Sequence, residues 1–179
     1  MDGAVTAWIN GFAGTAFFDA VMTAVSAYGV PVIVVLVAAQ WFTGAKGSRI
    51  RHVLIVAGLA FLASLAINQI VLMFVHRIRP YDAGVTLLLI ARSADWSFPS
   101  DHASASVAVA TAFLAKNLRA RGAVLAALAF LICLSRVFLG THYVGDVVGG
   151  AVTGIVAALV VVRYFREGNV VDRTAKSIL

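Results

Sequence analysis

The sequence is poor in charged residues and in cysteine. Of its 179 residues, 12% are Asp, Glu, Lys or Arg, about half the share found in soluble globular domains. This composition excludes an ordinary water-soluble domain and indicates an integral membrane protein. Cys133 is the single cysteine, which excludes an intrachain disulfide; within an apolar run it is expected to be an unreactive core thiol.

The sequence also lacks several other signals. It begins Met-Asp-Gly without a basic segment, so we expect no cleavable secretory signal. It contains no internal repeat or heptad pattern. The net charge is +6 and the isoelectric point is near 10.1, yet Lys and Arg lie in short loops between apolar runs. We therefore expect contact with anionic lipid and no binding of nucleic acid.

Long apolar runs dominate what is present. Hydrophobic residues make up 61% of the chain and the mean hydropathy is +0.96. A helix needs roughly 20 apolar residues to cross the bilayer core, or slightly fewer where an end is buried in protein. We predict an all-α, polytopic transmembrane helical bundle that forms a single domain over residues 1–179. Its five spans are expected at residues 17–43, 53–76, 102–116, 123–139 and 143–163.

The first run allows a sixth span, because Gly29 and Pro31 could divide it. Each half would have only about 13 residues, too few to cross, so we favour one bent span. Residues 3–14 are apolar but also too short to cross, and we expect an N-terminal interfacial helix there. Residues after Arg166 are polar and are expected to form a short mobile tail.

The distribution of Lys and Arg predicts the orientation, since loops retained in the cytoplasm are enriched in both. With five spans, ten of the 14 fall on one side: Lys46, Arg49, Arg51, Lys116, Arg119, Arg121, Arg163, Arg166, Arg173 and Lys176. The other side has only Arg77, Arg79, Arg92 and Arg136. The polar motifs described next lie on this second side, which we predict to face outward. Four span ends emerge on this side: the end of span two, the start of span three, the end of span four and the start of span five.

One polar motif consists of His142 and Asp146, four residues apart at a helix start. This spacing places both on one face, where the carboxylate can accept the Nδ1–H of the imidazole and leave Nε2 free as a nucleophile. A polar cap at the end of a span would have the same spacing. Arg79 and Arg136 each present a planar fork of donors suited to phosphate oxygens.

Residues 99–102, Pro-Ser-Asp-His, indicate a turn that enters a helix, with Ser100 or Asp101 as its N-cap. The free N–H groups of such a helix start bind anions, and the Ser100 hydroxyl adds a donor. His102, on the first turn, is placed to protonate a leaving oxygen. Cationic donors, a nucleophile and an acid are what phosphoryl transfer requires. No spacing resembles a zinc or two-metal site, so we expect no metal and no cofactor.

These motifs resemble the type 2 phosphatidic acid phosphatase (PAP2) superfamily, which shares its site with vanadium-dependent haloperoxidases. The resemblance covers about residues 50–165. It implies that His142 is a nucleophile that forms a phosphohistidine, Asp146 its orienting partner and His102 the general acid. It further implies that Arg79, Ser100 and Arg136 bind phosphate.

One position departs from the family pattern. The first motif of the family usually begins with Lys seven residues before the Arg of Arg-Pro, and Leu72 stands there. Arg77 is the replacement phosphate donor that we predict, and His76 is a weaker candidate. Both side chains would also suit snorkelling at the interface.

The Ser-Phe-Pro-Ser-Asp-His sequence and the missing Lys resemble the bacitracin-resistance-type undecaprenyl pyrophosphate phosphatases. This implies a polyprenyl diphosphate substrate, undecaprenyl pyrophosphate, cleaved to the monophosphate at the outer face of a bacterial inner membrane. The alternatives are another lipid (phosphatidylglycerol phosphate, phosphatidic acid or lipid A) or a non-catalytic protein that binds or transports an anion. The predicted spans disfavour a soluble haloperoxidase.

Overall fold

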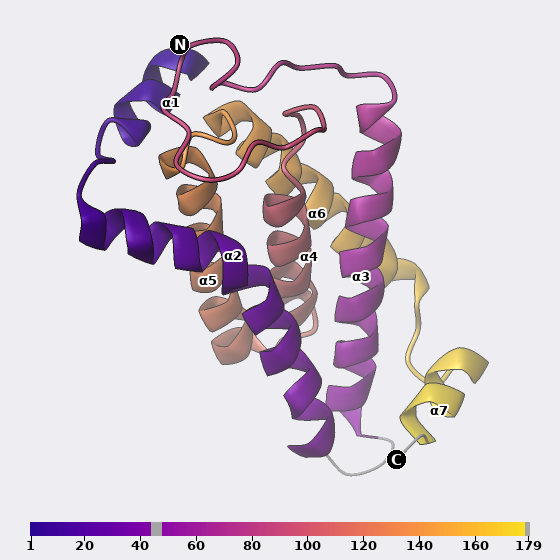
Figure 1. The fold of residues 1–179 in the computed structure, drawn as a ribbon. Coiled ribbons are helices and arrows are strands. Elements are labelled where there is room, and N and C mark those ends of the chain that lie inside the picture. Colours follow the sequence, from indigo (N-terminus) through magenta and orange to yellow (C-terminus); the bar gives the residue numbers. More distant parts are fainter. Residues whose placement is uncertain (44–47, 178–179) are drawn as a thin grey trace.

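The computed structural model describes residues 1–43 and 48–177, and every regular element in these ranges is helical (Figure 1). Lys46, one of the basic residues used to predict orientation, lies outside them. The elements are α1 (Asp2–Asn10), α2 (Ala16–Ala39), the 3-10 helix η1 (Gln40–Thr43), α3 (Arg49–Leu72), α4 (Asp101–Ala115), α5 (Arg119–Phe138), α6 (Val144–Tyr164) and α7 (Val170–Ser177).

Four helical segments in the described ranges have the length and hydropathy of membrane spans. They are Ala16–Thr43, Arg49–Leu72, Arg119–Phe138 and Val144–Tyr164. The remaining predicted span corresponds to α4, which has only 15 residues. Pro31 lies inside α2, which remains one helix and changes direction partway along its length (Figure 1). Pro31 therefore does not divide this run into two helices.

Helix α4 is the centre of the bundle and packs most extensively against α6, α5 and α3. Its approach to α6 depends on small residues, because a Cβ at Gly150 would meet the carbonyl oxygen of Ser100 and one at Gly154 that of Ser104. Two backbones approach this closely only where side chains are missing. The apolar core beside this contact includes Ile33, Val53, Phe113 and Ile132, all at most 1% exposed.

Residues 73–100 connect α3 to α4 without regular structure and lie over one end of the bundle (Figure 1). The predicted second span extended to residue 76, but α3 ends at Leu72. Backbone hydrogen bonds hold the segment in place, including Ser100 N–H to Asp146 O at 3.1 Å and Leu89 N–H to Leu139 O at 3.2 Å. A connection of this length in a compact bundle is usually functional.

Helix α7 lies at the opposite end of the bundle from α1 and residues 73–100 (Figure 1). Asp172 is fully buried there and accepts a 2.8 Å hydrogen bond from the His52 ring. The prediction of a mobile polar tail is therefore wrong for residues 170–177. The sequence signal was weak because α7 is short and docks through charged side chains rather than an apolar face.

Candidate active site

A small pocket of about 110 Å³ lies beneath residues 73–100, where three helix ends meet. Arg79 comes from the connecting segment, His102 from the first turn of α4, Arg136 from the last turn of α5, and His142 from the turn before α6. The predicted order of spans had placed these motifs, which lie far apart in the sequence, at the same end of the bundle. The remaining lining residues are Ser93, Asp95, Pro99 and Asp101.

The end of α5 brings Arg136 and His142 together. Gly140 adopts a left-handed conformation (φ +76°), and Thr141 N–H donates to Arg136 O at 3.1 Å. This geometry is typical of a helix C-terminus where a glycine reverses the chain. A Cβ at Gly140 would also meet the backbone oxygen of Leu87. The chain therefore turns sharply after α5, and His142 faces the same pocket as Arg136.

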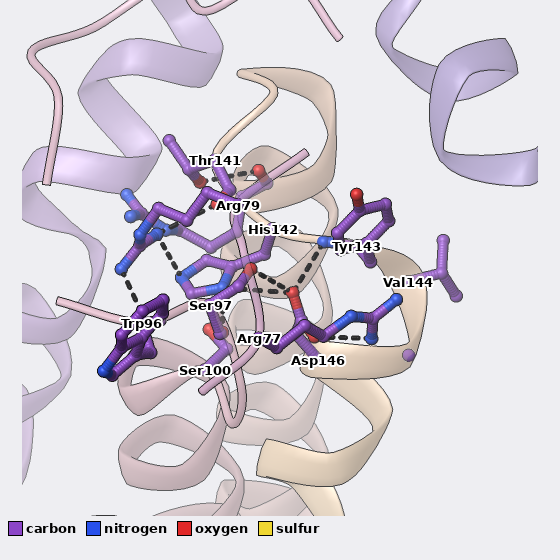
Figure 2. Close-up of polar contacts among 12 residues, drawn as sticks. Arg77, Arg79, Trp96, Ser97, Ser100, Thr141, His142, Tyr143, Val144 and Asp146 are labelled. Carbon is purple, nitrogen blue, oxygen red and sulfur yellow. Dashed lines mark hydrogen bonds and ion pairs between the residues drawn. The ribbon is translucent and has the colours of Figure 1, made fainter. Parts of the chain in front are cut away.

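The hydrogen bonds of His142 define its tautomer. Nδ1 lies 2.8 Å from the carbonyl oxygen of Ser97, and Nε2 lies 3.4 Å from a guanidinium nitrogen of Arg79 (Figure 2). A carbonyl oxygen only accepts and a guanidinium only donates, so the proton resides on Nδ1 and Nε2 carries the lone pair. Nε2, beside Arg79, is thus the ring nitrogen with a free lone pair.

Asp146 lies in the first turn of α6 and is completely buried. Its Oδ2 atom accepts hydrogen bonds from Ser97 Oγ at 2.5 Å and from Tyr143 N–H at 2.9 Å, and lies 3.7 Å from His142 Nδ1 (Figure 2). The sequence predicted a direct hydrogen bond from His142 to this carboxylate. The structure instead places the carbonyl of Ser97 at hydrogen-bond distance and uses the Ser97 hydroxyl to hold Asp146 beside the ring.

The pKa of His142 is lowered from its usual value. Burial disfavours the charged imidazolium, and the charges of Arg136 and Arg79 oppose protonation, while the Asp146 carboxylate offsets part of the shift. The ring is therefore neutral at neutral pH. A neutral imidazole with a free Nε2 lone pair is the form that can attack phosphorus.

Arg79 is buried, and residues close to the pocket occupy most of its donors. Its guanidinium donates to the Asp95 carboxylate at 2.7 Å and to Asp95 O at 3.0 Å. It also donates to Thr141 O at 2.9 Å (Figure 2). The pKa of Asp95 is lowered: burial alone would raise it, but the Ser93 hydroxyl and the Arg79 charge outweigh that effect. Asp95 therefore pairs with Arg79 as a carboxylate.

Arg136 is also buried but has fewer partners than Arg79. One of its terminal nitrogens donates to the hydroxyl of Ser26 in α2, and its Nε atom has no hydrogen-bond partner within the described ranges. Buried donors are rarely left unpaired without a functional reason. Ser100 repeats this pattern: its Oγ atom is buried and lacks a partner among the described residues. Both groups have donors available for an anion.

Ser100, one of the two predicted N-cap candidates, stands at the N-cap position of α4, but its side chain makes no capping hydrogen bond. Asp101 accepts a 2.7 Å hydrogen bond from Asn68 Nδ2 in α3. Asn68 also donates to Ser104 Oγ at 2.7 Å and accepts from Thr153 Oγ1 at 2.8 Å. This buried network ties α3, α4 and α6 together directly behind the pocket.

Arg77 lies beside this pocket rather than in its lining. Its two terminal nitrogens donate to Asp146 Oδ1 at 2.7 Å and Asp2 Oδ2 at 2.6 Å, and its guanidinium stacks over Tyr143. His76, the other candidate for the missing Lys, is exposed, and its ring centre is 5.0 Å from that of Trp96. Leu72 is the last residue of α3.

Sequence reasoning did not identify Ser97, Asp95 or Ser26. Ser97 lies in the Ser-Phe-Pro-Ser-Asp-His sequence that was singled out, so its place beside the motif was a usable signal. Asp95 and Ser26 gave no such signal, because only the fold brings them to Arg79 and Arg136. Within residues 1–43 and 48–177, no group of three or more His, Cys, Asp or Glu side chains is placed to hold a metal ion.

Comparison with solved structures identifies two similar folds. The chain matches a PAP2-type phosphatidylglycerolphosphate phosphatase from Bacillus subtilis with a TM-score of 0.70 and 23% identity, over 90% of this chain and 85% of the other. It matches LpxE from Aquifex aeolicus with a TM-score of 0.68 and 23% identity, over 90% and 94% of the two chains. At this identity the likeness shows the fold alone.

Sequence comparison identifies closer relatives. Undecaprenyl-diphosphatase BcrC of Bacillus subtilis (strain 168) is 34% identical over 82% of this chain and 74% of its own length. The putative undecaprenyl-diphosphatase YbjG of Escherichia coli (strain K12) is 30% identical over 73% of this chain and 65% of its own length. Together with the apolar helices, these matches make the chain a multi-pass membrane protein. Residues 52–169 match the PAP2 superfamily, to which the chain therefore belongs as a phosphatase.

Proposed function

We propose that this phosphatase hydrolyses a polyprenyl diphosphate, undecaprenyl diphosphate, to the monophosphate and inorganic phosphate. One observation carries the proposal: Nε2 of His142 lies 3.4 Å from a guanidinium nitrogen of Arg79, in a small pocket that Arg136 and His102 also line. The names of the two closer relatives support the choice of substrate. The apolar tail would lie between helices or in lipid.

The first half-reaction transfers the terminal phosphoryl group to the enzyme. Arg79, Arg136 and Ser100 Oγ bind its oxygens, and His142 Nε2 attacks the phosphorus. The bond between this phosphorus and the bridging oxygen breaks as the N–P bond forms. His102 donates a proton to the bridging oxygen, which leaves as the lipid monophosphate.

The second half-reaction regenerates the enzyme. His102, now without its proton, accepts one from a water molecule whose oxygen attacks the phosphohistidine. The N–P bond breaks, the electron pair returns to Nε2, and inorganic phosphate departs. Throughout, Ser97 and Asp146 hold the Nδ1 proton in place, while the arginines stabilise negative charge that develops on phosphorus-bound oxygens. Removing one such donor typically costs about 3 kcal/mol of transition-state stabilisation.

The membrane arrangement forms part of the proposal. Helices α2 to α6 make five spans, and the 15 residues of α4 are compatible with crossing because α3, α5 and α6 surround this helix. Helix α1 lies at the interface, and the whole chain forms one domain. The excess of Lys and Arg at the other end of the bundle supports an active site at the outer face of a bacterial inner membrane.

The experiment that tests this function is phosphate release by the purified protein in detergent with EDTA. Undecaprenyl diphosphate and phosphatidylglycerol phosphate are supplied separately to the wild type and to His142→Ala. We expect release from the diphosphate and none by the variant. Brief incubation with substrate labelled at the terminal phosphate should label the wild-type chain, through an acid-labile bond, but not the variant.

Arg166→Ala serves as the control substitution, since Arg166 is exposed in the connection between α6 and α7. It should retain full activity. Preference for phosphatidylglycerol phosphate would overturn the substrate assignment and leave the mechanism intact. Binding without release from either lipid would favour a non-catalytic anion-binding protein.

A further inference from the structure

Helix α1 presents its polar residues to the end of the bundle that carries the active site. Asp2, Thr6 and Asn10 recur every four residues and therefore share one face. Asp2 Oδ1 accepts from Gly145 N–H at 2.9 Å, and Thr6 Oγ1 accepts from Val144 N–H at 3.1 Å. These are free N–H groups of the first turn of α6, the turn that carries Asp146.

Asn10 anchors the other end of α1. Its amide donates to Leu87 O at 2.9 Å and to Phe138 O at 2.8 Å, and accepts from Leu87 N–H at 2.7 Å. Away from this polar face α1 is apolar and exposed, with Val5 47% and Trp8 67% accessible. Every polar side chain that faces the bundle is thus committed to a specific backbone partner, which fixes α1 relative to α6.

Asp2 is linked to the nucleophile through two further charged groups. Its Oδ2 atom lies 2.6 Å from one terminal nitrogen of Arg77, whose other terminal nitrogen lies 2.7 Å from Asp146 Oδ1. Asp146 in turn lies 3.7 Å from His142 Nδ1. A guanidinium that binds two carboxylates at once has a defined orientation, because its donors are coplanar. A Cβ at Gly145 would meet Asp2 Oδ2, so the glycine leaves room for this approach.

We propose that Asp2 and Arg77 are positioning residues that orient Asp146, and through it His142, so that the N-terminal helix completes the active site. This inference rests on the proposed role of His142 as nucleophile. It replaces the phosphate-binding role that the sequence predicted for Arg77, because Arg77, unlike Arg79, does not line the pocket that contains His142, and both of its terminal nitrogens bind carboxylates. Arg77 then does not replace the Lys that the family carries at the position of Leu72.

The test compares Asp2→Asn, Arg77→Gln and Arg77→Lys in the full-length protein, tagged at its C-terminus, with undecaprenyl diphosphate as substrate. Asp2→Asn and Arg77→Gln should each lower kcat about tenfold, since misplacement of a reacting group by up to 1 Å costs up to 100-fold. KM should change by less than about twofold, because neither residue lines the pocket that is proposed to bind phosphate. Arg77→Lys should recover part of kcat by retaining the charge.

The pH profile supplies a readout that a purely structural role would not move. The charged or titratable groups around His142 are Arg79 and Asp95 from residues 73–100, Asp101 and His102 from α4, Arg136 from α5 and Asp146 from α6. Arg77→Gln leaves Asp146 less neutralised, which stabilises the imidazolium, so the acidic limb of kcat/KM should shift to higher pH. Asp2→Asn leaves the Arg77 charge less compensated and should shift the limb to lower pH.

Asp19→Asn is the matched control, because Asp19 accepts only an exposed hydrogen bond from Gly14 N–H within the described residues. It should match the wild type. A raised KM with unchanged kcat in Arg77→Gln would overturn the inference in favour of phosphate binding. Wild-type kinetics in Asp2→Asn, or a lower melting temperature without a shifted pH limb, would overturn it as well. A wild type that releases no phosphate, or an active His142→Ala, would instead show that the proposed function has failed.

Discussion

The carbonyl oxygen of Ser97 lies 2.8 Å from Nδ1 of His142, while the Ser97 hydroxyl lies 2.5 Å from Asp146 (Figure 2). One residue thus contacts both members of the pair expected to form the nucleophile and its orienting carboxylate. The carbonyl fixes the proton on Nδ1, and the hydroxyl holds the negative charge beside the ring. A change at Ser97 should therefore affect the positions of both His142 and Asp146.

Ser97→Ala should lower kcat about tenfold and leave KM nearly unchanged. The substitution removes the hydroxyl that binds Asp146 but keeps the carbonyl that binds His142, so the loss should be smaller than in Asp146→Ala. Steady-state phosphate release measures both constants. Ser177→Ala, an exposed serine in α7, is the matched control. If Ser97→Ala lowers kcat as much as Asp146→Ala does, the separate roles of the Ser97 hydroxyl and carbonyl would be contradicted.

The activity should fall in acid as His142 becomes protonated. Burial and the nearby arginines hold its pKa below the usual value of about 6.5. The neutral, nucleophilic form is therefore present above the lowered pKa and is lost as the pH falls through it. We expect kcat/KM to retain most of its value near pH 6.5 and to decline only below it. An acidic limb with a midpoint above about 6.5 would contradict this prediction.

Asp95→Asn should strengthen the binding of anions to the pocket. The Asp95 carboxylate occupies the Arg79 guanidinium that is expected to hold phosphate, so an incoming anion competes with it. Removing that charge should lower the inhibition constants of orthovanadate and inorganic phosphate severalfold. Asp82→Asn, which breaks the exposed ion pair with Arg92 in the same segment, is the control and should change neither. Weaker inhibition in Asp95→Asn would mean that Asp95 orients Arg79 instead of competing for it.

Gly154→Ala should destabilise the bundle by about 1–3 kcal/mol, the usual cost of forcing an extra methyl group into a packed interior. The new Cβ would meet the carbonyl oxygen of Ser104 and the amide of Ala108, so α4 and α6 must separate. Thermal unfolding in detergent measures the loss. Gly58→Ala places its Cβ in open space within α3 and should leave the melting temperature unchanged or slightly raised. Equal melting temperatures for the two variants would contradict the packing argument.

The long helices were readable from the sequence for a simple physical reason. In the membrane interior a backbone must satisfy its own hydrogen bonds, so a long apolar run is a helix almost regardless of its neighbours. Predicted and observed boundaries agree within a few residues for α2, α4, α5 and α6. The predicted spans left a long connection between residues 76 and 102, but the contacts that hold it over the bundle and the docking of helix α7 were not foreseen, because both depend on polar contacts with distant segments.

The sequence by itself determined that the chain crosses a membrane several times and that Arg79, His102, Arg136 and His142 lie at helix ends on the same side. Hydropathy and the alternation of spans are sufficient for both conclusions. Only the tertiary structure decided that Ser97 contacts both His142 and Asp146 and that the Asp95 carboxylate binds the guanidinium of Arg79. It also decided that Asp2 binds Arg77, 75 positions away in the sequence. These contacts depend on side-chain directions and on distances of a few ångström between remote segments, which no local pattern encodes.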